Sequence, residues 1–194
     1  SAHRGRQVAC RSGSSESEPE EMSLPLRHRT FSWHDPAEIR ARAQGKSGLE
    51  FLRAMLAGEI PPPPVAELVG VHLELVEPGR VVFVLAPAEF HLNPNSALHG
   101  GIAALVCDTA CGCAVISELP PGETCATLEI KVNYLRPVGV ATARLECIGT
   151  VLHLGRRSAL AEARLVDPRG KLVAHATSTL MLFPPEDPHG YPYG

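Results

Sequence analysis

One stretch of the chain, Leu98–Leu119, constrains the fold more than any other. From Ile102 to Ile116 its residues are apolar or small on every face, with a single charged exception at Asp108. A helix with this pattern is surrounded by protein rather than laid on a surface with one face in water. We therefore expect a long central helix, and the rest of the chain must supply the structure that encloses it.

This helix has two polar features, Asp108 within it and His99-Gly100-Gly101 at its start, and both are suited to chemistry. Burying an unpaired carboxylate is unfavourable, so Asp108 predicts a polar site within an otherwise apolar wall. His99-Gly100-Gly101 places two glycines at the helix start, where unpaired N–H groups and the positive end of the helix dipole attract anions. The alternative is a core helix whose aspartate only bonds to neighbouring hydroxyl groups.

Composition narrows the class of protein and its partners. The 194 residues are 44% hydrophobic and 20% charged, which fits one globular domain. A net charge of −3 gives no reason to expect nucleic acid or an anionic membrane surface as a partner. No apolar run approaches the roughly 20 residues of a membrane-spanning helix, and the first residues lack the apolar core of a secretory signal. We expect a cytoplasmic protein.

The cysteines and histidines predict no metal site. The six cysteines are Cys10, Cys107, Cys111, Cys113, Cys125 and Cys147. On a helix, Cys113 points about 200° away from Cys111, so the three helical cysteines cannot converge on one metal ion. We interpret the cysteines as small buried residues of a reduced protein. The histidines outside the helix start are expected to be structural or exposed.

The first 60 residues divide into two predicted parts. Residues 1–30 are rich in Ser, Glu and Arg and are predicted to be disordered, with Met22 as a candidate native start. Residues 31–60 are predicted to form a helical extension that begins at Asp35-Pro36. Gly45 and Ser47 are candidate breaks in that helix, and Gly58 ends it.

Residues 61–183 carry the pattern of one domain, followed by a predicted flexible tail over residues 184–194. Alternating apolar residues predict a hairpin over residues 71–85, ahead of the central helix. Further strands are predicted over residues 127–134, 141–152, 157–166 and 172–183. In the first of them, Ile130 and Tyr134 are expected on one face with Leu128 and Val132, and Thr127 on the opposite face. Short turns make these strands antiparallel neighbours. The predicted class is α+β, with a curved antiparallel sheet wrapped around the central helix.

Arranged in this way, the chain resembles the hotdog-fold acyl-CoA thioesterases of the PaaI type, which take their name from phenylacetic-acid degradation. The resemblance covers roughly residues 64–183 and leaves residues 1–60 without a counterpart. Its most specific part is Asn93, followed after five residues by His99-Gly100-Gly101 and then by Asp108. Thr127 and the run Asn133-Tyr134-Leu135-Arg136-Pro137 fit the strand that follows the helix.

The resemblance implies hydrolysis of an acyl-CoA thioester with no cofactor, since coenzyme A is part of the substrate. Asp108 is then the general base that activates water, which we favour, or a nucleophile, and the Gly100 N–H is the donor to the oxyanion. Asn93 matches the amide at the substrate carbonyl or the attacking water. Thr127 matches the hydroxyl that holds the acid and the water, and His99 is expected to orient the site.

Spacing along the helix has a consequence for assembly. Gly100 and Asp108 are eight residues apart, or about 12 Å along a straight helix. One thioester carbonyl needs its oxyanion donor and its base within roughly 3 Å of the reacting atoms. A single subunit therefore cannot supply both. The resemblance implies a homodimer in which one chain supplies the segment from Asn93 to Gly100 and the other supplies Asp108 and Thr127. A dimer of dimers is the expected assembly.

Two questions about the substrate and the reaction stay open in the sequence. Arg136, Arg156 and Arg157 lie at predicted strand ends or turns and are candidates for the phosphates of coenzyme A, with solvated surface charge as the alternative. The function could instead be that of a non-catalytic acyl-CoA-binding module or a structural homo-oligomer. An acyl-CoA hydratase or dehydratase would need a paired histidine and acid, whereas His99 and Asp108 lie about 180° apart on the helix.

Overall fold

The computed structural model describes residues 24–185 of the chain. Residues 1–23 and 186–194 lie outside the described residues, and with them most of the predicted disordered segment, most of the predicted tail, Cys10 and Met22. The chain divides into two units, Ser1–Thr30 and Phe31–Gly194. The described residues of the first unit, 24–30, form no helix or strand. Every element below belongs to the second unit.

The second unit is built on one six-stranded sheet with the strand order β1-β2-β4-β5-β6-β3. The strands are β1 (Val71–Glu77), β2 (Arg80–Leu85), β3 (Thr124–Tyr134), β4 (Leu145–Leu154), β5 (Ser158–Val166) and β6 (Leu172–Phe183). All neighbouring strands pair antiparallel, and β1 and β3 form the two edges. β4 begins at Leu145 rather than at residue 141, because a turn closed by the Thr142 N–H and the Gly139 carbonyl precedes it.

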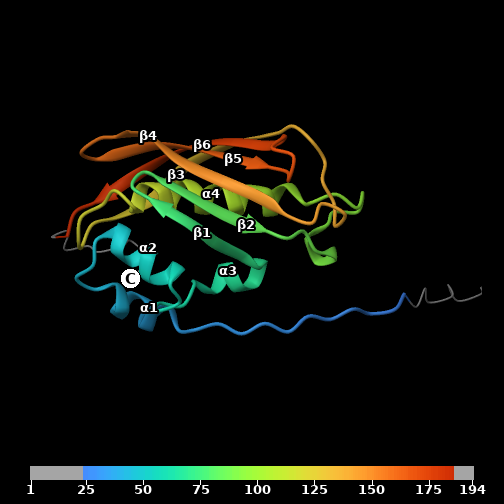
Figure 1. The fold of residues 1–194 in the computed structure, drawn as a ribbon, viewed down its shortest axis with the longest axis horizontal. Helices are drawn as coiled ribbons and strands as arrows, with labels where there is room; N and C mark the ends of the chain where they lie inside the picture. Colours follow the sequence, from blue (N-terminus) through green and yellow to red (C-terminus); the bar gives the residue numbers. More distant parts are fainter. Residues whose placement is uncertain (1–23, 186–194) are drawn as a thin grey trace, which may run out of the picture. The chain divides into compact units, whose positions relative to one another are not determined.

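The central helix α4 (Gly100–Ile116) lies against the concave side of this sheet (Figure 1). It contacts β2, β3, β4, β5 and β6. The approach to β4 is so close that a Cβ atom at Gly149 would stand 2.2 Å from the Ala110 carbonyl oxygen, which leaves room for glycine alone. The α+β class and the sheet curved around one long helix are confirmed.

Burial of α4 differs from the prediction in one respect. The face turned to the sheet is fully buried, with Val106, Cys107 and Ala110 all at 0% exposure. The opposite face, which includes Leu105 and Asp108, is only half-buried. The physical reason is that one sheet covers one side of a helix, and α2 (Gly48–Leu56) contacts the other side only near the C-terminal end of α4. The acid therefore stands at an accessible face.

A β-bulge in β3 overturns the predicted division of its faces. Thr127 pairs with Leu180 of β6, whereas Glu129 pairs with Thr179, so Leu128 is an extra residue without a partner. One extra residue reverses the alternation of side chains along a strand. Thr127 therefore lies on the helix-facing side together with Ile130, while Leu128 is 58% exposed. The prediction that Thr127 lies opposite Ile130 is wrong for this reason.

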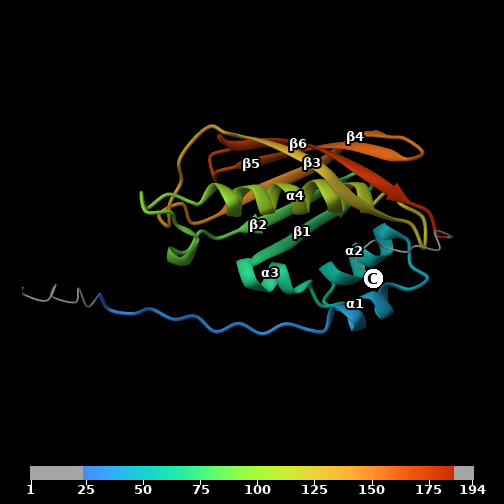
Figure 2. The same ribbon diagram turned by 180° about the vertical axis from the view of Figure 1, so that it is seen from behind.

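Three helices precede the sheet: α1 (Pro36–Ala43), α2 (Gly48–Leu56) and α3 (Pro64–Val69). The predicted break between the first two is confirmed, because Gly45 takes a positive φ of 77° and Ser47 caps α2 through a reciprocal capping box with Glu50. Figures 1 and 2 show from opposite sides that α2 and α3 lie along β1. Within residues 24–185, no helix is both long and apolar enough to cross a membrane.

Candidate active site

The carboxylate of Asp108 meets the hydroxyl of Thr127 on the half-buried face of α4. Thr127 Oγ1 donates a hydrogen bond of 2.9 Å to Asp108 Oδ1. The bulge at Leu128 makes this contact possible, because it turns Thr127 toward the helix. Within the described residues Asp108 accepts no other hydrogen bond, so its second oxygen is available to a water or a substrate. We call this pair the acid half-site.

The start of α4 forms a second polar site. His99 caps the helix by accepting the Gly101 N–H at its Nδ1 atom over 2.9 Å. The Gly100 N–H has no acceptor within the described part of the chain, as expected for the first turn of a helix. Tyr134 Oη donates to the Gly100 carbonyl over 3.0 Å, and a Cβ atom at position 100 would lie 3.2 Å from the Tyr134 ring. The Gly100 N–H is available to bind an anionic oxygen, while the Tyr134 hydroxyl holds the carbonyl of the same residue.

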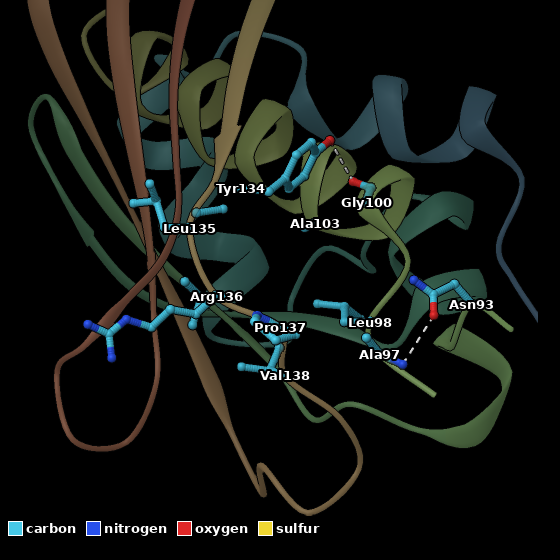
Figure 3. A pocket seen from close by; sticks show the side chains of 12 residues that line it. Asn93, Ala97, Leu98, Gly100, Ala103, Tyr134, Leu135, Arg136, Pro137 and Val138 are labelled. Atoms are coloured by element: carbon cyan, nitrogen blue, oxygen red, sulfur yellow. Dashed lines mark hydrogen bonds between the residues drawn. The ribbon is translucent and has the colours of Figure 1, made fainter. Parts of the chain in front are cut away.

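Asn93 begins the loop that leads into α4. Its Oδ1 atom accepts the N–H groups of Asn95 at 2.9 Å and Ala97 at 3.2 Å. These bonds fix the side chain in the loop and leave its Nδ2 group as a donor. Asn93, Gly100, Tyr134 and Arg136 line one pocket of about 420 Å³ (Figure 3). We call these four residues the helix-start half-site.

The two half-sites do not meet within one chain. Neither Asp108 nor Thr127 lines the pocket that contains Asn93 and Gly100. Eight residues of continuous helix separate Gly100 from Asp108, a rise of about 12 Å. The structure thus brings together the predicted residues in two groups and keeps the groups apart.

The three candidate arginines are also divided. Arg136 follows β3, and its N–H donates to the Val173 carbonyl at the start of β6. Arg156 and Arg157 lie in the turn between β4 and β5, where the Arg157 carbonyl accepts the Leu182 N–H at the far end of β6. Nine residues of strand separate Val173 from Leu182, or about 30 Å. Within one chain these arginines cannot hold the same phosphate.

The Cys113 thiol and the buried His91 ring are unsuited to nucleophilic or metal chemistry. The five described cysteines are free, and four are buried while Cys113 is half-buried. Burial and the nearby Cys125 raise the pKa of Cys113 to about 12, so its thiol stays protonated and weakly nucleophilic at neutral pH. His91 is buried between the Val69 carbonyl and the Ala88 N–H, which is a structural role. In residues 24–185, no cluster of His, Cys, Asp and Glu could hold a metal ion.

Tyr134 is the site residue that sequence reasoning left without a role. It ends β3 and is 57% exposed, yet its hydroxyl reaches the first carbonyl of α4. The pattern of the sequence placed Tyr134 on an apolar face, which is typical of a core residue. The contact of its phenol group could have been recognised only from the packing of the end of β3 against the start of α4, which brings together residues more than 30 positions apart.

The known proteins that resemble this chain include thioesterases and a CoA hydrolase. A family model described as the thioesterase superfamily matches residues 95–174, which include Gly100, Asp108 and Thr127. The 1,4-dihydroxy-2-naphthoyl-CoA hydrolase of Listeria monocytogenes is 28% identical over 116 residues, which cover 59% of this chain and 91% of that protein.

Two solved structures share the fold and a moderate level of identity. A phenylacetic acid degradation-related protein from Ralstonia eutropha is 30% identical with a TM-score of 0.61, over 66% of this chain and 97% of that one. A hypothetical thioesterase protein with coenzyme A, from Streptococcus pneumoniae, is 27% identical with a TM-score of 0.54. The match covers 59% of this chain and 86% of that one.

Proposed function

The chain belongs to the thioesterase superfamily, and on that premise we propose that it hydrolyses an acyl-CoA to a free acid and coenzyme A. The observation that carries the proposal is the acid half-site, because a carboxylate held by one hydroxyl at an accessible helix face is equipped to activate water. The Listeria relative is named for hydrolysis of a CoA thioester, and the Streptococcus structure contains coenzyme A. Both support CoA as the carrier of the acyl group.

The proposed mechanism uses a water rather than a covalent intermediate. Asp108 accepts a proton from the water while Thr127 holds the carboxylate in place through Oγ1. The water oxygen attacks the thioester carbonyl carbon, and the carbonyl oxygen becomes negatively charged. The Gly100 N–H, reinforced by the dipole of α4, stabilises that charge. The C–S bond then breaks, and the CoA sulfur leaves with a proton returned from Asp108.

Other residues around the start of α4 position the substrate and the oxyanion donor. Asn93 offers its Nδ2 group to the thioester carbonyl or to the attacking water. His99 fixes the entry of the chain into α4 by capping the helix. Tyr134 donates to the Gly100 carbonyl from the side of β3, which fixes the first turn of α4 directly after the peptide group that carries the oxyanion donor.

A twofold dimer along β3 completes the site. β3 is an edge of the sheet, so its unpaired backbone N–H and C=O groups are available to pair with another strand. The exposed apolar side chains of β3 include Leu128 and Tyr134. Antiparallel pairing of two β3 strands sets the C-terminal end of each beside the N-terminal end of the other. Gly100, near Tyr134, then faces the Asp108 and Thr127 of the second subunit. A dimer of dimers stays a prediction.

The same pairing explains how distant arginines serve one molecule of coenzyme A. Arg136 belongs to the C-terminal end of β3, whereas Arg157 lies near its N-terminal end through β6. In an antiparallel dimer, Arg136 of one subunit is therefore on the same side as Arg156 and Arg157 of the other. We assign the CoA phosphates to this mixed cluster.

Replacement of Asp108 by Asn tests the proposed activity. The substitution keeps the size and the hydrogen bond to Thr127 but removes the base, so kcat falls by roughly 10²–10⁴. Thiol release from short, long and aromatic acyl-CoAs measures the rate, and calorimetry shows that substrate binding is retained. Glu118→Gln, the same chemical change just beyond α4, is the control and leaves kcat unchanged. A wild-type protein that binds acyl-CoA without releasing thiol would instead be a binding module.

A further inference from the structure

A second cavity lies between the N-terminal helices and α4. Its volume is about 420 Å³, within the range of roughly 300–1,000 Å³ found for ligand pockets. Phe51 and Met55 of α2, Leu73 of β1, and Cys113 and Ile116 of α4 are among the residues that line it. Among the described residues its lining includes no Asp, Glu, Lys or Arg, and its polar side chains are those of His72 and Thr109. The cavity therefore suits a hydrocarbon and disfavours a charged group.

The cavity adjoins the acid half-site on the surface of α4. Thr109, the residue after Asp108, lines the cavity together with Cys113 and Ile116, one and two turns further along the same face. Going around the helix from Asp108, Gly112 comes after about 40° and Ile116 after about 80°. A Cβ atom at Gly112 would meet nothing within 4 Å. The space between the acid and the cavity is thus open where a glycine stands.

Within one chain, Gly112 has no packing reason to be glycine. A helix-interior glycine is less favourable than alanine by about fivefold in the folding equilibrium constant. At Gly149, by contrast, the neighbouring backbone of α4 leaves no room for a side chain. The structure offers no such contact at Gly112. A side chain at position 112 would fill the space that leads from Asp108 to the cavity.

The α2 side of the cavity is held against α4 by direct backbone contacts. Gly48, the first residue of α2, donates its N–H to the Leu119 carbonyl over 3.0 Å. A Cβ atom at Gly48 would lie 1.7 Å from the Ile116 carbonyl oxygen, so the two backbones touch. Leu52 of α2 is 1% exposed and belongs to the main core. The cavity is therefore formed between fixed elements of one unit.

We propose that this cavity holds the distal hydrocarbon chain of the acyl group, which makes the protein selective for acyl-CoA substrates much longer than acetyl. This inference rests on the proposed function, because it deepens the same site. The thioester lies at Asp108, the chain passes Gly112, and its end lies between α2 and β1. The helical extension, which precedes the segment matched by the family model, then sets the substrate class of this chain.

Binding of octanoyl-CoA and acetyl-CoA to the Asp108→Asn variant tests the proposal without turnover. Each methylene transferred to an apolar cavity gains up to about fourfold in affinity, so octanoyl-CoA binds at least about tenfold more tightly than acetyl-CoA. Calorimetry measures both constants. Equal affinity for the two ligands would overturn the inference. A wild-type protein that binds octanoyl-CoA more tightly but releases no thiol would overturn the proposed function and leave the acyl cavity standing.

Two variants in this Asp108→Asn background locate the chain in the cavity. Met55→Trp fills the cavity from α2, and Gly112→Leu closes the route at α4. Each reduces the preference for octanoyl-CoA to less than about threefold while the affinity for acetyl-CoA stays the same. Arg53→Trp adds the same ring on the exposed side of α2, outside the cavity lining, and is the matched control, with the preference retained. Unchanged preference in both Met55→Trp and Gly112→Leu, each shown to be folded by circular dichroism, would contradict the assignment.

Discussion

At the level of single residues, two contributions of Gly100 can be tested separately: its backbone N–H group and its lack of a side chain. It is the first residue of α4, where proline is tolerated because that N–H has no partner within the helix. His99 has a φ of −61° and a ψ of 133°, an extended conformation compatible with a following proline. Gly100→Pro therefore deletes the donor without breaking the helix. We expect kcat to fall by about 10²–10³, as for loss of one oxyanion donor.

The matched control for this prediction is Gly100→Ala. Alanine adds the same Cβ atom 3.2 Å from the Tyr134 ring but keeps the N–H, so its loss in kcat stays below about tenfold. Steady-state thiol release, with the dimer mass verified for each variant, gives the comparison. If the proline and alanine variants lose activity equally, crowding of Tyr134 is the cause and the oxyanion donor lies elsewhere.

At the scale of elements, α2 is attached to the C-terminal end of α4 through Gly48. A methyl group at this position forces the helices apart, because it overlaps the Ile116 carbonyl. Gly48→Ala is expected to destabilise the fold by about 1–3 kcal/mol, seen as a lower midpoint of urea unfolding. Gly112→Ala is the control and leaves the midpoint unchanged or raises it. Equal midpoints for wild type and Gly48→Ala would show that α2 is not docked as described.

Elements were predictable to different degrees for physical reasons. The division of α1 from α2 follows from local chemistry, since a glycine at positive φ and a serine cap act within a few residues. The faces of β3 were predicted wrongly, because the bulge at Leu128 depends on pairing with β6, more than 50 residues later. Strict alternation in a sequence cannot reveal an unpaired residue. The contact of Thr127 with Asp108 was nevertheless implied by the resemblance.

At the scale of the molecule, the residues proposed to carry the chemistry could be selected from the sequence, whereas their surroundings could not. Asp108 and Gly100 stand out because their neighbours along α4 are apolar. The cavity beside them was not predictable, since α2, β1 and α4 come from three separate parts of the chain and their packing creates it. The same holds for the position of Tyr134 over Gly100. Spacing along one helix, however, was enough to predict that a complete site needs two subunits, and this stays a prediction.

A shared site makes a prediction about mixed dimers. Asn93→Ala and Asp108→Asn damage different half-sites, so each protein alone is nearly inactive in every site. When the two are unfolded and refolded together, random pairing makes half of the dimers mixed. In a mixed dimer one site carries both lesions and the other carries neither. Thiol release should therefore recover to roughly a quarter of the wild-type rate.

If each chain held a complete site, every site would keep one lesion. Activity at the level of the single variants, with mixed dimers identified by native mass spectrometry, would exclude the shared site.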